Sequence, residues 1–287
     1  MENNSATTEP IVETPQVGMI GFTCPRDGGN YRFDHCIYKC EDTCEPLPLL
    51  LALMSEKKVV PGRYSVTELL NPPQQTFLGR HHPYYSEPES MIAMTFGSAW
   101  HGVLEAGKEK LRELKMVDRF AIEESFYEKI ETPFGTGTLS GRPDLYDRQT
   151  KILWDWKSVK GYFLKKIRSQ GWSGTTYHHQ LNTYRVYHFL EAQHMKLKIL
   201  VKDFSEKMKA IDGIRQVETL DVPLINDKLV RQNIEAKMGL QFQYEVNPEL
   251  VRPCSGVDTW GGKKCTDYCN VYLSCPQYLA KNKGGVN

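Results

Sequence analysis

Long apolar runs are missing from this chain of 287 residues, and so is a strong excess of charge of either sign. No run approaches the roughly 18 consecutive apolar residues that a membrane-spanning helix needs. The N-terminal stretch is polar and slightly acidic, without the apolar segment of a secretory leader. Because 36 Lys and Arg stand against 35 Asp and Glu, a surface that binds nucleic acid must be a local one. These absences predict a soluble intracellular protein without a membrane partner.

The rest of the composition is that of a globular protein, with one exception. Hydrophobic residues make up 40% and charged residues 25% of the chain, which suits an ordinary core in one large or two modest domains. The exception is cysteine, because eight occur in two groups near the ends. In a reducing cytosol, closely spaced cysteines indicate metal ligation. The alternative is a secreted disulfide scaffold, which needs a leader and usually a short chain.

The first cysteine group has the spacing C-x11-C-x3-C-x3-C and comprises Cys24, Cys36, Cys40 and Cys44. Four thiolates can close a tetrahedral structural site around zinc. The spacings of three are looser than those of the familiar zinc knuckle, and the alternative is a set of buried free thiols. The sequence therefore predicts a zinc site here, with buried thiols as the competing interpretation.

The second cysteine group has the spacing C-x10-C-x3-C-x5-C and comprises Cys254, Cys265, Cys269 and Cys275. Three closely spaced cysteines with a fourth upstream suit either an iron–sulfur cluster or zinc. The spacing by itself does not choose between the two.

A hairpin-like stretch over residues 140–157 carries the chemistry. Asp144 ends one extended run, and the next offers Asp155 and Lys157 on one face, because side chains alternate along a strand. Trp154 and Trp156 should then point the other way, into a core. Two carboxylates and an ammonium on one patch can hold a divalent cation beside a phosphate.

Two helices add candidate residues. In the helix predicted over residues 89–115, His101 lies one turn after Gly97 and one turn before Glu105. A metal ligand and a structural histidine are about equally plausible interpretations of His101. In the helix predicted over residues 175–194, Gln180 and Tyr184 are one turn apart, and Tyr184 alone would more often be a core residue.

The remaining periodicities give a coarse outline. A basic and aromatic segment, 160–172, fits either a groove that tracks nucleic acid or a solvated amphipathic segment. Residues 80–85 are interpreted as a surface loop. Strands are predicted over residues 116–130, 132–147, 151–159, 197–204 and 217–222, and further helices over 49–58, 64–70 and 224–244. The helix over 64–70 has Ser65 as its N-cap and ends at Asn71-Pro72-Pro73.

Together these features resemble the RecB-like branch of the PD-(D/E)XK nuclease superfamily. The resemblance is greatest to its iron–sulfur members, such as the CRISPR-adaptation and AddB-type nucleases, and covers residues from about 64 to 276. A lone Pro-Asp with Asp-x-Lys is weak, but the ordered set is specific. The matching elements are His101, Pro143-Asp144, Asp155-Trp156-Lys157, Gln180-x3-Tyr184 and the C-terminal cysteines.

The resemblance implies an α/β fold, with a restriction-endonuclease-like core whose mixed central β-sheet is flanked by helices. It implies that His101, Asp144 and Asp155 bind Mg²⁺ or Mn²⁺, and that Lys157 orients water and stabilises charge on the phosphate. Gln180 and Tyr184 would position DNA or support the site. The expected domains are a disordered tail (1–20), a cysteine-rich segment (21–60), the nuclease core (61–250) and a cysteine-cluster segment (251–287).

One departure concerns the iron–sulfur site. In the relatives a cysteine before the histidine-bearing helix joins three C-terminal cysteines, whereas this chain has Asn71-Pro72-Pro73 there. The fourth ligand is then either Cys254 or one of Cys24 to Cys44. The favoured assignment is a [4Fe-4S] cluster on the four C-terminal cysteines, with zinc bound separately by the N-terminal four.

The predicted function is a metal-dependent DNA exonuclease in recombination, repair or phage DNA processing. Its substrate would be single-stranded or end-bearing double-stranded DNA, and a helicase or recombinase is a possible partner. The cytoplasm of a prokaryotic or phage-infected cell is the expected location. The alternative is a catalytically silent module that binds nucleic acid and keeps its clusters for structure. Intact Asp144, Asp155 and Lys157 favour the enzyme.

Overall fold

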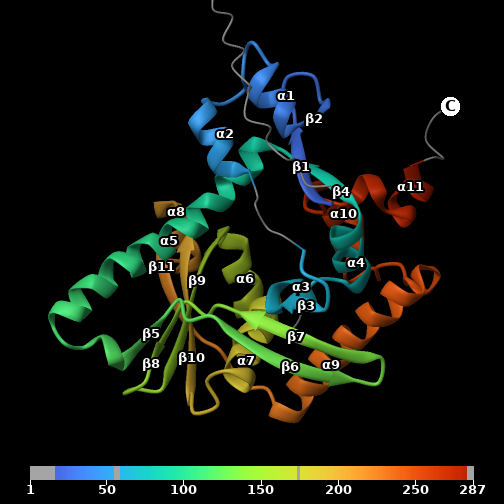
Figure 1. The fold of residues 1–287 in the computed structure, drawn as a ribbon. Coiled ribbons are helices and arrows are strands. Elements are labelled where there is room, and N and C mark those ends of the chain that lie inside the picture. The colour runs from blue at the N-terminus through green and yellow to red at the C-terminus, as the bar shows by residue number, and fades with distance from the viewer. Residues whose placement is uncertain (1–16, 55–58, 173–174, 283–287) are drawn as a thin grey trace, which may run out of the picture. The chain divides into compact units, whose positions relative to one another are not determined.

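A computed structural model describes residues 17–54, 59–172 and 175–282, and it has a mixed α/β fold (Figure 1). The chain divides into two compact units, and each is described on its own. The core unit comprises Val60–Phe77 and Ala93–Asp258. The cysteine-rich unit comprises Met1–Val59, Leu78–Ile92 and Thr259–Asn287.

The core unit is built on two sheets. The central sheet has the order β11-β10-β9-β8-β5; β9 and β10 are parallel and the other pairs are antiparallel, so it is mixed as predicted. A smaller sheet has the order β3-β7-β6. The strands are β3 (Arg63–Ser65), β5 (Phe120–Ile122), β6 (Phe126–Thr132), β7 (Gly135–Gly141), β8 (Leu145–Asp147), β9 (Ile152–Val159), β10 (His194–Val201) and β11 (Val217–Asp221).

Helices pack on these sheets. The parallel strands β9 and β10 cannot be joined by a direct turn, so α6 and α7 form the crossover connection between them. Helix α7 contacts β9 as well as α3 and α9, and α9 also contacts β6 and β7. The buried cluster between them includes Leu139, Leu153, Leu181, Leu197 and Met238. The helices of the core unit are α3 (Val66–Leu70), α6 (Gly161–Gln170), α7 (Thr176–Tyr187), α8 (Glu206–Asp212) and α9 (Asp227–Val246).

The cysteine-rich unit has its own sheet, of order β2-β1-β4, and a small apolar cluster. Two helices, α4 (Pro73–His81) and α5 (Pro88–Glu113), have residues in both units. The other elements are β1 (Gly18–Thr23), β2 (Asn30–Arg32), β4 (Pro83–Ser86), α1 (Phe33–Tyr38), α2 (Leu47–Leu53), α10 (Lys263–Asp267) and α11 (Pro276–Asn282).

Several predicted elements are confirmed. The hairpin of β8 and β9 pairs Leu145 with Trp154 in antiparallel register. Helix α3 begins with a capping box, in which the Ser65 hydroxyl accepts from the Glu68 amide and the Glu68 carboxylate accepts from the Ser65 amide. Residues 160–172 contain α6, whose Leu164 and Ile167 are buried, so the segment is amphipathic.

Other boundaries differ from the prediction. The extended region 116–147 is not two strands, because the chain breaks at Glu123, which has a left-handed backbone (φ +53°), and around Pro143. Helix α7 ends at Tyr187, since residues from His194 onward form the parallel strand β10. Residues 80–85 are the end of α4 and most of β4 rather than a loop. Proline, positive φ and sheet pairing override the local propensity at these places.

The orientation of β9 was predicted wrongly. Its buried face carries Leu153 and Asp155, which are 0% and 2% exposed, whereas Trp154 and Trp156 are only partly buried. The face with the carboxylate is therefore the one that packs into the core.

Some predictions fall on residues that are not described. The predicted tail lies outside the described residues up to position 16, while β1 already begins at Gly18. Residues 55–58 of the helix predicted over 49–58 also lie outside them. In the described part of the chain, no helix combines the length and hydropathy that a membrane span requires.

Candidate metal-dependent active site

A metal-binding geometry lies in the core unit. His101, Glu123 and Asp144 each offer a ligand atom, and these atoms all lie within 4.8 Å of one another. His101 comes from α5, Glu123 directly follows β5, and Asp144 directly precedes β8. The His101 Nδ1 atom is 3.8 Å from Asp144 Oδ1 and forms a hydrogen bond with the Glu123 carboxylate. An imidazole and two carboxylates suit a divalent cation.

Glu123 is held in place by its backbone and by the guanidinium group of Arg142. Its left-handed φ of +53° is uncommon outside glycine, and such strained residues gather at functional sites. The Glu123 amide donates to the Asp144 carbonyl at 3.1 Å, which fixes the end of β5 beside the start of β8. On the other side, Arg142 Nε lies 2.8 Å from Glu123 Oε2. The Arg142 side chain is 59% exposed, so its guanidinium lies at the solvent-facing edge of the site formed by His101, Glu123 and Asp144.

Asp144 is also tied to the neighbouring strand. Its Oδ2 atom accepts a hydrogen bond from the Trp156 amide at 2.7 Å. This bond places the carboxylate next to Asp155 and Lys157, which share a face of β9. Lys157 Nζ is 2.5 Å from Asp155 Oδ2 and 5.4 Å from the centre of the Tyr177 ring on α7. The hairpin therefore brings two buried carboxylates and one ammonium to a single patch.

Burial dominates the electrostatics of this patch. Desolvation, followed by the charge of Asp155, raises the pKa of Asp144 to about 7, although Lys157, the Trp156 amide and His101 oppose the shift. Burial also acts to lower the pKa of Lys157, but the carboxylates of Asp155 and Asp144 outweigh it and hold that pKa above its ordinary value. Lys157 is thus charged at neutral pH, and a further cation beside Asp144 would favour its ionised form.

The residues present fit a divalent cation. Apart from its ion pair with Lys157, the buried Asp155 Oδ2 has no hydrogen-bond partner among the described residues. Asp155 is not a member of the group whose atoms lie within 4.8 Å of one another. His101, Glu123 and Asp144 are the side chains that could hold the ion as the atoms stand, with Asp155 beside them.

Gln180 and Tyr184 lie on α7, which contacts β9. Gln180 Nε2 donates to the Tyr184 hydroxyl at 2.9 Å, so the two predicted residues form one unit. Tyr184 is buried, and burial raises its pKa to about 12. Its ring packs against Gly141, where an added Cβ would come within 2.7 Å of Tyr184 Cε1. This close approach explains a glycine just before Arg142 and Asp144.

The sequence missed one member of the metal-binding group. Glu123 falls inside the continuous strand that the sequence predicts over 116–130, and nothing in the local pattern marks the strand break. Of the predicted residues, His101 and Asp144 are brought together, and Asp155 and Lys157 pair beside them. Glu105, which shares the helical face of His101, is largely exposed and pairs with Lys108 instead.

The cysteines are separate from this group. Cys24, Cys36, Cys40 and Cys44 all lie in the cysteine-rich unit, as do Cys265, Cys269 and Cys275, whereas Cys254 belongs to the core unit. None of these eight residues, all of which are described, is joined in a disulfide. No three of their sulfurs lie within 4.8 Å of one another.

Comparisons with known proteins gave matches only among solved structures; no family model and no curated protein matches the chain. A protein designated SSO0001 is 16% identical, with a TM-score of 0.48 over 80% of this chain and 93% of its own. The alkaline exonuclease LHK-Exo from Laribacter hongkongensis is 14% identical, with a TM-score of 0.37 over 70% of this chain and 93% of its own. A phage-related exonuclease from Haemophilus somnus 129PT is 12% identical, with a TM-score of 0.30 over 53% of this chain and 73% of its own. At these values the likenesses establish neither a family nor an activity for this chain.

Asp144→Asn should stabilise the metal-free protein at pH 8. The raised pKa means that the folded state holds a proton on Asp144 below about pH 7, and that its stability falls as pH rises from the unfolded pKa to that value. Removing the charge should raise the free energy of unfolding at pH 8 by roughly 1–3 kcal/mol. Thermal unfolding with a chelator at pH 5 and pH 8 measures this, and the gain should shrink at pH 5.

Asp147→Asn is the matched control, with the opposite sign. Asp147 lies in the same hairpin, but Arg119 binds both its oxygens, at 2.9 and 2.7 Å, and this hydrogen bonding holds its pKa below the ordinary value. The variant should therefore lose stability at pH 8. A loss of stability in Asp144→Asn as well would contradict the assignment of a destabilising buried charge.

Glu123→Gln should weaken binding of Mn²⁺ to the protein without DNA. The amide keeps the size of the side chain but removes one negative ligand, so we expect a loss of about tenfold or more in affinity, as loss of even an outer-shell partner produces. Calorimetric titration with Mn²⁺ measures it. Glu124→Gln is the control, because that neighbouring carboxylate pairs with Arg148 and His188 instead. Equal affinities for both variants would exclude Glu123 as a ligand.

Proposed function

We propose that this protein is a metal-dependent DNA nuclease that hydrolyses phosphodiester bonds. The observation that carries the proposal is the convergence on one buried patch of residues that are far apart in the sequence. His101, Glu123 and Asp144 offer atoms for a cation, and the ion pair of Asp155 and Lys157 lies beside them. Carboxylates that can hold a divalent cation beside a fixed ammonium suit a reaction on a phosphate diester.

A divalent ion such as Mg²⁺ or Mn²⁺ supplies Lewis-acid chemistry and a more acidic bound water when it is held at such a site. The protein supplies the rest. Lys157 is held in its charged form by Asp155 and Asp144, so it can stabilise negative charge that develops on the phosphate. Arg142 offers a planar guanidinium at the rim, suited to a neighbouring backbone phosphate. Gln180 and Tyr184 lie on α7, which contacts β9, and would help to position the site or the DNA.

The finer parts of the proposal rest on the sequence. The resemblance to RecB-like nucleases favours an exonuclease in recombination, repair or phage DNA processing. It also favours DNA with a single strand or a free end as substrate. A helicase or recombinase partner and a cytoplasmic location stay predictions of the same kind.

Asp155→Ala should abolish Mg²⁺- or Mn²⁺-dependent degradation of linear DNA. Loss of this carboxylate removes both a candidate ligand and the ion pair that positions Lys157, so we expect at least a hundredfold drop in rate, about that of losing one preorganised catalytic group. End-labelled linear DNA and a closed circle of the same sequence measure the rate and its dependence on ends.

The control is Asp221→Ala, which removes a largely exposed carboxylate paired with Lys196 on the neighbouring strand. It should digest DNA at the wild-type rate. Unchanged digestion by Asp155→Ala would show that the site is wrongly assigned. DNA binding without digestion by the wild type would favour the alternative, a silent binding module.

We also propose an iron–sulfur cluster at the C-terminal cysteines. Burial raises the pKa of the Cys269 thiol, and the neighbouring Cys275 and Cys265 thiols add to the shift, so these three interact. Together with Cys254 they make four cysteines, the number that commonly binds a [4Fe-4S] cluster. Cys254, the fourth ligand in the sequence-based assignment, belongs to the core unit, and its participation stays a prediction.

Anaerobically purified protein should therefore be coloured and contain iron and acid-labile sulfide. Cys269→Ser should lose both the broad visible absorbance and the iron, because a cluster rarely survives the loss of a central ligand. Cys36→Ser is the matched control and should keep them. Colourless protein that contains zinc and no iron would refute the cluster.

A further inference from the structure

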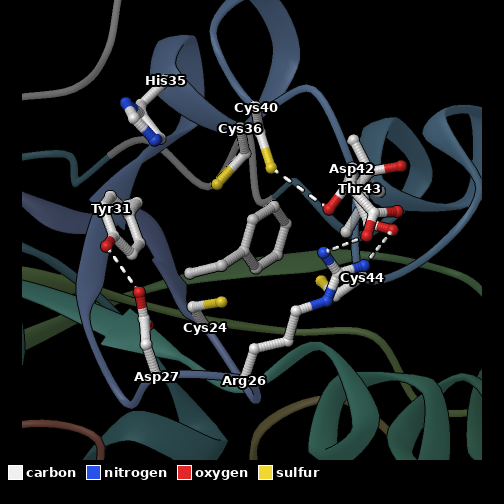
Figure 2. Close-up of a pocket in the computed structure, with 12 residues that line it drawn as sticks. Cys24, Arg26, Asp27, Tyr31, His35, Cys36, Cys40, Asp42, Thr43 and Cys44 are labelled. Carbon is white, nitrogen blue, oxygen red and sulfur yellow. Dashed lines mark hydrogen bonds and ion pairs between the residues drawn. The ribbon is translucent and has the colours of Figure 1, made fainter.

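The cysteine-rich unit contains a pocket that the nuclease proposal does not use. Its volume is about 190 Å³, and all four N-terminal cysteines line it (Figure 2). Cys24 lies in the turn between β1 and β2, Cys36 in α1, Cys40 two residues after α1, and Cys44 in the segment before α2. Four thiols from four successive pieces of the chain thus border one space.

We propose that this pocket is a structural zinc site with Cys24, Cys36, Cys40 and Cys44 as its four ligands. It is distinct from the candidate active site, and it would exist whether or not the protein is a nuclease. Zinc prefers thiolates in a closed tetrahedral set, and Cys₄ is one of its common structural forms. The x11, x3 and x3 spacings become compact here because the β1–β2 turn folds Cys24 back toward α1.

The backbone holds the first ligand in a defined turn. The Cys24 amide donates to the Gly29 carbonyl at 2.7 Å, and the Gly28 amide donates to the Cys24 carbonyl at 2.9 Å. Gly28 has a φ of +71°, which suits glycine in a tight turn. At the other end, the Cys40 amide closes the last turn of α1 by donating to the His35 carbonyl at 3.0 Å. Both ligands are therefore anchored before a metal arrives.

The four thiols are near enough to interact, but they have not closed on one point. Burial raises the pKa of Cys36 to about 11, and Cys40, Cys44 and Cys24 all add to the shift. No three of these sulfurs lie within 4.8 Å of one another, whereas sulfurs around zinc stand about 3.8 Å apart at a Zn–S distance of about 2.3 Å. Binding would thus draw the four sulfurs closer together than they stand here.

The charged residues that line the pocket already pair with other residues. Arg26 pairs with Asp42 at 2.6 Å and donates to the Thr43 carbonyl at 3.0 Å, which ties the β1–β2 turn to the segment between Cys40 and Cys44. The His35 ring stacks on Tyr31 with centroids 4.6 Å apart, and Figure 2 shows it turned away from the sulfurs. Among the residues that line the pocket, the thiols are therefore the soft ligands available to a metal.

The small core explains why a metal would be needed. The apolar cluster of this unit is built on Met19, Phe22, Phe33, Leu50 and Leu53. A core of that size buries little surface, and small units of this kind commonly depend on a metal or a disulfide. Zinc would link the β1–β2 turn, α1 and the approach to α2, the same pieces whose apolar residues form the cluster. Its binding would then contribute to folding.

The first test uses the wild-type full-length protein and needs no variant. Protein as purified, protein treated with a chelator, and chelated protein resupplied with zinc are alkylated, and the modified cysteines are mapped by mass spectrometry. Cys24, Cys36, Cys40 and Cys44 should be protected in the first and third samples and modified in the second. Equal modification of these four cysteines in all three samples would overturn the proposal.

The second test counts the metal. Cys36→Ser should lose one zinc per chain relative to the wild type, because a closed four-ligand site does not tolerate the loss of a thiolate. His35→Ala should keep that zinc, since His35 is a stacked neighbour and not a ligand, and Cys269→Ser should keep it as well. Loss of iron instead of zinc from Cys36→Ser, or an unchanged zinc content, would overturn the proposal. Neither measurement depends on nuclease activity.

Discussion

The constraint on which the core unit depends is the burial of two carboxylates side by side. Asp144 and Asp155 are 5% and 2% exposed, and burial together with the charge of Asp155 raises the electrostatic cost of ionising Asp144. Lys157 offsets part of that cost, and a divalent cation would offset the rest. The hydrogen bond from the Trp156 amide to Asp144 keeps the two carboxylates together when they would otherwise repel. Stability is therefore lower here than an apolar pair would give, as is usual where a site is preorganised for charge.

The two points at which the chain passes between the central sheet and the smaller sheet both contribute to this patch. The chain leaves regular strand geometry at Glu123, with its positive φ, and again between β7 and β8 around Pro143. Each break sets a carboxylate at a strand end, and the bond from the Glu123 amide to the Asp144 carbonyl joins the two breaks. A continuous strand would have alternated these side chains between faces. The two strand ends thus bring together Glu123 and Asp144, which with His101 could hold a cation.

The cysteine-rich unit is stabilised differently from the core unit. Its apolar cluster is small, and its thiols are gathered around a pocket instead of being dispersed through a core. The core unit, in contrast, has an extensive buried cluster that spans both of its sheets and the helices α7 and α9. One unit is stabilised chiefly by apolar burial, and the other gathers four thiols which, in our proposal, would bind zinc.

Local periodicity, a cap and alternation along a strand determined the β8–β9 hairpin, the capped helix α3 and the placement of Asp155 and Lys157 on one strand face. The mixed α/β fold was expected from the resemblance of the ordered set of motifs to a nuclease superfamily. The tertiary structure decided that the Asp155 face of β9 is the buried one, since packing on both faces of a sheet cannot be read from alternation. It also decided that Glu123 joins His101 and Asp144, because a strand break and a contact between residues 22 apart leave no periodic signal. The grouping of the N-terminal cysteines in one pocket likewise depends on a turn and a helix end, whereas their spacing alone could only suggest it.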